Sequence, residues 1–89
     1  MTLSISLEEI LESLNDTSWD LLQIINANPD FSFKDIQKES NLSQEKCYKE
    51  LCRLEGGVLI KGKRRFADKR VMGYEITIYG EEALKRHLN

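Results

Sequence analysis

Hydrophobic residues recur at helical spacing at the start of the chain. Four of them follow the i, i+3, i+4, i+7 rule that places side chains on one face of an α-helix. Ser6 and Glu9, three residues apart, form a capping box at the front of this pattern. The pattern therefore predicts a first helix, whose apolar face consists of Leu7, Ile10, Leu11 and Leu14.

A broader apolar stripe follows and predicts a second helix. Asn15 opens an Asn-Asp-Thr-Ser start signal, and the stripe ends at Asn28-Pro29, where proline disfavours a helical conformation of the residue before it. Because this is the most apolar of the expected helices, it should lie at the centre of the core. Its stripe consists of Trp19, Leu21, Leu22, Ile24 and Ile25.

Two short helical patterns joined by a tight turn predict a helix-turn-helix over about residues 33–55. Ser32 supplies an N-cap for the first helix, which ends near Asn41, and Ser43 caps the second. Gly56-Gly57 ends the second helix. Its inward row, at i, i+4, i+7, is Cys47, Leu51 and Leu54.

The residues after these glycines predict a β-hairpin, or wing, over about residues 58–78. A first strand opens at Val58-Leu59-Ile60, and a second strand returns over residues 71–78. We expect the basic segment between them, residues 61–70, to form the loop, centred near residues 67–69.

The last stretch predicts a C-terminal helix over about residues 79–88, with Leu84 and Leu88 on one face. The expected fold class is α+β, mostly α: a winged helix-turn-helix with three N-terminal helices plus a recognition helix, a two-stranded β-wing and a C-terminal helix. A chain of 89 residues, 40% hydrophobic, should form one domain over residues 1–89. At this size oligomerisation is a favourable way to bury more surface.

Membrane and secretion signals are missing from the sequence. No stretch approaches the roughly 20 apolar residues of a membrane span. The acidic, amphipathic N-terminus lacks the basic-then-apolar layout of a signal peptide. We therefore expect a cytoplasmic protein that makes no membrane contact.

Charge is distributed unevenly behind a formal net charge of −2. Residues 1–43 hold eight acidic side chains against two lysines, whereas residues 44–89 hold eleven Lys and Arg against seven acids. Within residues 61–70 six basic side chains meet one acid. Phosphate attraction acts over a Debye length of roughly 8 Å, so local charge matters more than the total. The basic hairpin thus predicts contact with nucleic acid, although lysines also protect edge strands from aggregation.

The outer face of the helix over residues 43–55 is the candidate for reading bases. Lysine and arginine there can donate to guanine or to phosphate oxygens in the major groove. An ordinary solvated face is the alternative, but the preceding turn and the basic hairpin favour DNA. The Glu45 carboxylate repels DNA phosphates unless it accepts a hydrogen bond from cytosine or forms an ion pair with Lys49. The face carries Glu45, Lys46, Lys49, Cys52 and Arg53, with Tyr48 at its edge and Ser43 and Gln44 at the helix start.

Four stretches, taken in order and spacing, resemble winged helix-turn-helix transcriptional regulators of bacteria and archaea, of the arsenic-repressor or multiple-antibiotic-resistance-repressor type. The resemblance covers roughly residues 17–84. The stretches are Trp19-Asp-Leu-Leu-Gln-Ile-Ile, Phe33-Lys-Asp-Ile-Gln-Lys-Glu-Ser-Asn-Leu-Ser, Tyr48-Lys-Glu-Leu-Cys-Arg-Leu and Tyr74-Glu-Ile-Thr-Ile-Tyr-Gly.

The resemblance implies a sequence-specific regulator of transcription that binds double-stranded DNA. The recognition helix would enter the major groove, and the wing would follow the backbone or the minor groove. By position, the groove residues are Ser43, Gln44, Lys46, Tyr48, Lys49 and Arg53, and the wing residues are Lys63, Arg64, Arg65, Lys69 and Arg70, to which the basic segment adds Lys61.

Specificity for DNA also favours a homodimer, because one module of this size contacts few base pairs. Apolar residues near the two ends are candidates for the dimer contact, and covering the core of the monomer is the alternative for them. These residues are Leu3, Ile5 and Leu7, with Leu84 and Leu88.

The residues give little support for metal, cofactor or enzymatic chemistry. Regulators of the arsenic-repressor branch place two cysteines close together on the recognition helix, whereas here Cys47 should point inward and Cys52 outward. A redox role of Cys52 stays open. His87 is the sole histidine and has no nucleophile at a suitable spacing, so we expect a non-enzyme without metal, cofactor or evident small-molecule ligand.

Two other functions remain as alternatives to a specific regulator. A winged helix can serve as a protein-interaction adaptor, because fold alone does not give function. That role would favour an apolar outer face on the helix over residues 43–55, and this chain has a charged one. A non-specific, architectural or RNA-binding protein would use the wing without base readout by the helix.

Overall fold

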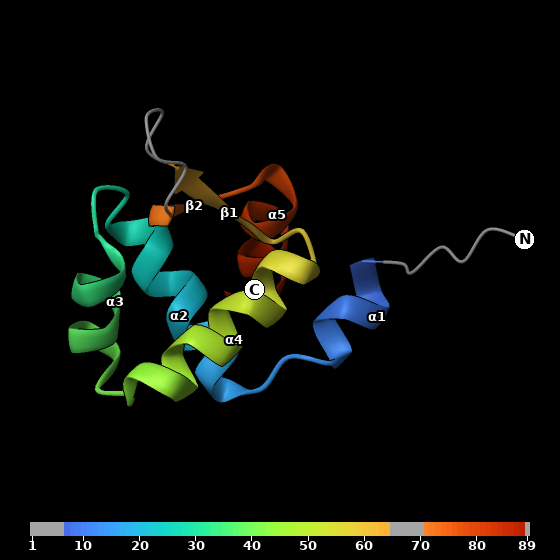
Figure 1. Cartoon of the computed structure of the whole chain (residues 1–89). Helices are drawn as coiled ribbons and strands as arrows, with labels where there is room; N and C mark the ends of the chain where they lie inside the picture. Colours follow the sequence, from blue (N-terminus) through green and yellow to red (C-terminus); the bar gives the residue numbers. More distant parts are fainter. Residues whose placement is uncertain (1–6, 65–70, 89) are drawn as a thin grey trace, which may run out of the picture.

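The computed structural model describes residues 7–64 and 71–88 of the chain (Figure 1). Within these ranges it confirms the expected winged helix-turn-helix order. The elements are α1 (Leu7–Glu12), α2 (Asp16–Ala27), α3 (Phe33–Ser40), α4 (Gln44–Gly56), β1 (Ile60–Arg64), β2 (Val71–Ile76) and α5 (Ile78–Leu88).

Helices α2, α3 and α4 begin at the caps expected from the sequence. The Asn15 side chain accepts from the backbone N–H of Ser18 at 2.9 Å, and the Ser43 hydroxyl accepts from that of Lys46 at 3.2 Å. Ser32 caps α3 in a reciprocal pair with Asp35, a capping box. Each cap satisfies a backbone donor that has no partner inside its helix, which fixes where the helix starts.

The turn between α3 and α4 depends on Asn41. This residue adopts the left-handed conformation, with φ of 60°, which asparagine tolerates better than most residues. The chain can therefore reverse within three residues and start α4 directly after Ser43. A tight turn of this kind sets the angle at which α4 is presented.

Helix α2 lies at the centre of the core, as expected. Leu21, Leu22 and Ile25 are buried on it, and α2 packs against α3, α4, α5 and β2. The expected pair on the last helix is split, because Leu84 is buried whereas Leu88 is 68% exposed. The whole core cluster is Leu21, Leu22, Ile25, Ile36, Cys47, Leu51, Leu54, Leu59, Ile60, Tyr74, Ala83 and Leu84.

His87 makes a contact that the sequence did not suggest. The side chain of His87 is exposed near the end of α5. Its ring also stacks on Trp19, with ring centroids 3.9 Å apart and an interplanar angle of 6°. The end of α5 is thereby held against the start of α2.

The wing begins later than expected and includes part of the basic segment. β1 pairs antiparallel with β2 and starts at Ile60, because Val58 has a positive φ of 56° that no strand accepts. The strand then runs to Arg64, so residues 61–64 are strand and not loop. The expected loop centre, residues 67–69, lies outside the described residues.

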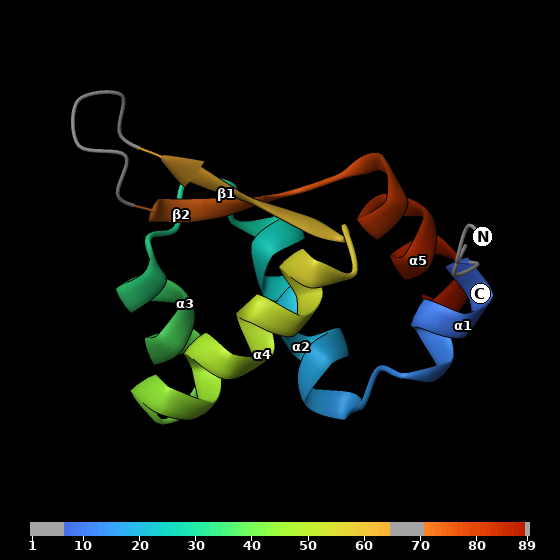
Figure 2. The same ribbon diagram turned by 45° about the vertical axis from the view of Figure 1, so that its right-hand side comes forward.

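The base of the wing is fixed to the helix-turn-helix. Gly73 of β2 forms a β-bridge with Ser32, and a Cβ atom at Gly73 would lie 2.6 Å from the carbonyl oxygen of Phe31. The Lys63 ammonium donates to the carbonyl oxygen of Pro29. Figure 2 shows the two strands passing over α2 and α4, with the C-terminal end of β1 on the α3 side. The wing is therefore held against the segment that leads into α3.

Candidate nucleic-acid interface

Helix α4 has the inward and outward faces that its sequence indicated. Cys47, Leu51 and Leu54 are fully buried, whereas Cys52 is exposed. The six groove residues expected from the sequence are all exposed. They are Ser43, Gln44, Lys46, Tyr48, Lys49 and Arg53.

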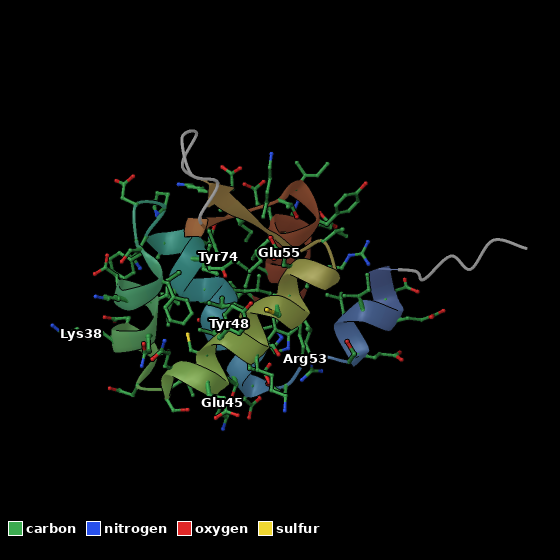
Figure 3. The ribbon with its side chains drawn as sticks, in the orientation of Figure 1. Lys38, Glu45, Tyr48, Arg53, Glu55 and Tyr74 are labelled. Atoms are coloured by element: carbon green, nitrogen blue, oxygen red, sulfur yellow. The ribbon has the colours of Figure 1, made fainter. Side chains whose placement is uncertain are left out.

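One side of α4 is rich in cations. A hollow of about 430 Å³ lies there, and we call its basic residues, Lys46, Lys49 and Arg53, the cationic flank. In Figure 3 Arg53 lies on the side of α4 that faces α1. The hollow is also lined by the hydroxyl-bearing Ser43 and by Glu45 and Glu50. Ammonium and guanidinium groups around one hollow suit a phosphate oxygen.

A buried carboxylate supports the cationic flank, and sequence reasoning missed it. Glu50 is only 8% exposed. It accepts from the Ser18 hydroxyl at 3.2 Å and from the Arg53 guanidinium at 3.3 Å. Both partners are needed, because a buried carboxylate without them is strongly destabilising. The only local signal was the i, i+3 spacing of Glu50 and Arg53, and the contact with Ser18 spans 32 residues.

Arg53 is held on two sides by the protein. Its guanidinium donates to Glu50 and, through the other terminal nitrogen, to the carbonyl oxygen of Ser13 at 3.1 Å. The side chain remains 46% exposed, and a guanidinium has five N–H donors, so donors are left for an external acceptor. Arg53 therefore presents a fixed, positively charged fork instead of a mobile chain.

The opposite side of α4 is aromatic. A hollow of about 300 Å³ is lined by Phe33, Gln44, Tyr48 and Tyr74, and we call these four residues the aromatic flank. The rings of Phe33 and Tyr48 meet edge to face, with centroids 6.4 Å apart and an interplanar angle of 63°. Tyr48 is 59% exposed, whereas Tyr74 is 4% exposed. Figure 3 shows Tyr48 and Tyr74 on the side of α4 away from Arg53.

Both phenols of the aromatic flank are neutral at physiological pH. A hydrogen bond with the Cys52 side chain, together with the charge effect of that group, raises the pKa of Tyr48. Burial, followed by the nearby Glu55 carboxylate, raises the pKa of Tyr74 to about 12. The flank therefore adds no phenolate charge that would repel a polyanion.

Glu55 connects α4 to the wing. Its carboxylate accepts from the backbone N–H of Gly62 in β1 at 3.1 Å. The hydrogen bond satisfies a donor on the strand and ties the C-terminal part of α4 to the base of the hairpin. Helix α4 and the wing are thus held in a fixed mutual orientation.

The described wing cations lie along β1. Lys61 is exposed, and its Nζ lies 4.0 Å from Oε1 of Glu75, the residue opposite it on β2. Lys63 is held by Pro29, as described above. The remaining expected wing residues, Arg65, Lys69 and Arg70, and the side chain of Arg64, lie outside the described residues. Their part in the interface stays a prediction.

Neither a candidate metal site nor a membrane-spanning helix occurs within the described ranges. Over residues 7–64 and 71–88, no group of three or more His, Cys, Asp or Glu side chains could hold a metal ion. In the same ranges, none of the helices is long and apolar enough to cross a bilayer.

These features define a winged helix-turn-helix: α3 and α4 form the helix pair, and β1 and β2 form the wing. Solved structures with the same fold confirm this assignment. BpsR of Bordetella bronchiseptica, a protein whose DNA binding is regulated by 6-hydroxynicotinic acid, aligns with a TM-score of 0.79 at 18% identity, over 86% of this chain and 58% of its own.

Two further structures give the same result. FabT of Streptococcus pneumoniae, in complex with DNA, aligns with a TM-score of 0.76 at 21% identity, over 86% of this chain and 54% of its own. MarR of Staphylococcus aureus, in complex with salicylate and kanamycin, aligns with a TM-score of 0.74 at 23% identity, over 89% of this chain and 54% of its own. This chain thus spans little more than half the length of each. At these identities the likeness establishes the shared fold.

Sequence comparison adds no relative. No protein-family model matches the chain, and no curated protein sequence matches it.

Proposed function

We propose that this protein is a sequence-specific, double-stranded-DNA-binding regulator of transcription. Helix α4 enters the major groove, and the wing lies on the backbone or in the minor groove. The observation that carries the proposal is the exposed surface of α4, where cationic side chains line one flank and Gln44 and Tyr48 line the other. A helix of 13 residues, presented by a rigid frame, has the dimensions that the major groove admits.

The roles of the exposed residues follow from their chemistry. Gln44 stands at the start of α4, where base edges are commonly met, and its amide can donate to and accept from adenine. Lys49, in the middle of the outer face, can donate to guanine or to a phosphate. Arg53, held by Glu50 and Ser13, suits a backbone phosphate because its donors are fixed.

The structural neighbours support this proposal. FabT was solved with DNA bound, and BpsR is a protein whose DNA binding is regulated. These properties belong to those proteins. They are consistent with DNA binding by a chain of this fold.

We also propose that the regulator acts in the cytoplasm, without catalysis, as a homodimer on a pseudo-palindromic site. Leu84 covers the core, so it is not available for a dimer contact. Leu88, by contrast, leaves an uncovered apolar side chain at the end of α5. Leu3 and Ile5, with the side chain of Leu7, lie outside the described residues, and their part in a dimer stays a prediction.

Binding of a random duplex, measured over a series of salt concentrations, tests the proposal. About five phosphate contacts should give a log–log slope of about −4 to −5. Lys85→Ala, which removes an exposed lysine of α5 far from α4, is the matched control and should leave the slope unchanged. Absent binding, or an affinity that does not depend on salt, would contradict a DNA-binding function.

A further inference from the structure

The aromatic flank has an unusual combination of exposure and order. Tyr48 leaves 59% of its surface open to solvent, a large value for an aromatic side chain on a small protein. Its ring is nevertheless supported, because Phe33 meets it edge to face. A supported aromatic ring that faces solvent is a preorganised contact surface, which loses little side-chain freedom on binding.

The hollow beside this ring suits a small apolar group. Its back wall is the buried Tyr74, its sides are Phe33 and Tyr48, and all four residues that line it are uncharged. The hollow on the other side of α4 is lined instead by Lys46, Lys49 and Arg53, which suit a phosphate. The two hollows therefore discriminate between the charged and the apolar groups that DNA presents.

The major groove of DNA offers one apolar group for such a hollow. The thymine 5-methyl group projects into the groove, whereas cytosine presents a hydrogen there and an amino donor beside it. Gln44 belongs to the same hollow and stands one helical turn before Tyr48, on the same side of α4. Glutamine is the side chain whose amide matches adenine N6 and N7.

We propose that the aromatic flank reads A·T base pairs: the thymine 5-methyl group enters the hollow formed by Phe33, Tyr48 and Tyr74, and Gln44 binds a neighbouring adenine. The inference rests on the proposed DNA-binding function and adds the identity of the base that is read. Tyr48 is then a specificity-determining residue, and the rings of Phe33 and Tyr74 hold the shape of its hollow.

Removal of a single methyl group from DNA tests the proposal. A duplex that binds tightly is first selected from random sequences. Its thymines are then replaced one at a time by deoxyuridine, which pairs identically but lacks the methyl group. At one thymine in each half-site the replacement should weaken binding by about fourfold, the ratio that corresponds to one buried methyl group.

Two variants of Tyr48 connect that loss to the aromatic flank. Tyr48→Phe keeps the ring and should still bind the deoxyuridine duplex about fourfold more weakly than the thymine duplex. Tyr48→Ala removes the wall of the hollow and should bind the thymine and deoxyuridine duplexes equally. Because Tyr48 is exposed, both variants should fold, and circular dichroism with thermal melting verifies this. Lys85→Ala serves as the control, and its loss of affinity for the deoxyuridine duplex should match that of the unmodified protein.

The possible outcomes distinguish a failure of thymine readout from a failure of DNA binding. If binding is selective and salt-dependent but every deoxyuridine duplex binds as tightly as its parent, thymine readout is wrong and the DNA-binding function stands. An unchanged penalty in Tyr48→Ala would likewise assign the methyl contact to other residues. Failure to bind any duplex would overturn both.

Discussion

The cationic and aromatic flanks of α4 differ in chemistry although one helix carries both. The cationic flank gathers Lys46, Lys49 and Arg53 around a hollow, whereas the aromatic flank presents uncharged residues around Tyr48. Phosphates are the same at every base pair, so a charged surface gives affinity without sequence information. An apolar hollow with one amide distinguishes bases but adds little long-range attraction.

The flanks are also held in place differently. Arg53 is fixed by a buried carboxylate and a backbone carbonyl, whereas Tyr48 is supported by the ring of Phe33. Loss of a polar support leaves a buried group without a partner, whereas loss of an exposed ring removes only contact area. Loss of Glu50, the buried support of the cationic flank, should therefore affect folding first, whereas loss of the exposed ring of Tyr48 should affect recognition.

The largest effect is expected from Glu50→Ala. The substitution leaves the buried Ser18 hydroxyl and the Arg53 guanidinium without their shared acceptor, and should lower the free energy of unfolding by about 2–3 kcal/mol. Urea unfolding monitored by circular dichroism measures it. Glu45→Ala, on the exposed side of the same helix, should change stability by less than about 0.5 kcal/mol. Equal losses of unfolding free energy at the two positions would mean that Glu50 stabilises the fold no more than a surface carboxylate does.

Replacement of Gln44 should come next. Gln44→Ala removes the amide from the aromatic flank and should narrow the gap in binding free energy between selected and random duplexes by about 1–3 kcal/mol. Competition binding at fixed salt gives this difference directly. Lys46→Ala, two residues along and on the cationic flank, should weaken both complexes alike. A uniform loss in the Gln44 variant would place base readout elsewhere on the surface.

Arg53→Ala should give a smaller and more uniform effect. It removes one cation, so binding to every sequence should weaken and the log–log salt slope should become shallower by about 0.9. Glu50→Gln keeps the size of the side chain but weakens the acceptor that orients Arg53, and should reduce the slope in the same direction. Should Arg53→Ala instead alter the preference between sequences, Arg53 would be a base reader.

The smallest effect concerns the ionisation of Tyr74 in the aromatic flank, which is not seen at neutral pH and appears only above pH 10. The folded-state pKa of Tyr74, about 12, exceeds the ordinary value of 10.0, so its contribution to stability is fully present below pH 10 and is lost as the pH rises toward 12. The stability of Tyr74→Phe should therefore decline less steeply above pH 10 than that of the unmodified protein. Lysines titrate in the same window and affect both proteins alike. Parallel declines would mean that Tyr74 ionises as freely in the folded protein as in the unfolded chain.

Local signals in the sequence predicted most of the backbone correctly. Asn15, Ser32 and Ser43 start their helices as expected, because a cap needs only the few residues that follow it. The start of β1 was wrong by two residues, since the positive φ of Val58 arises from how α4 ends and not from a strand preference.

Contacts between distant residues could not be read from the sequence. The exposure of Gln44 and Tyr48 followed from helical periodicity, but the aromatic flank also needs Phe33 from α3 and Tyr74 from β2. The partnership of Glu50 with Ser18 depends on how α2 crosses α4. Such pairs become visible only when packing brings the elements together.

A titration followed by nuclear magnetic resonance tests the proposed interface most directly. Isotope-labelled protein is mixed with a random duplex and then with a selected one, and the amide shifts are mapped on the chain. We predict shifts across α4 and β1 with both duplexes, and additional shifts at Phe33, Tyr48 and Tyr74 with the selected duplex alone. Shifts confined to the opposite end of the sheet, around the exposed Ile78 and Tyr79, with α4 unaffected, would contradict α4 as the DNA-reading element.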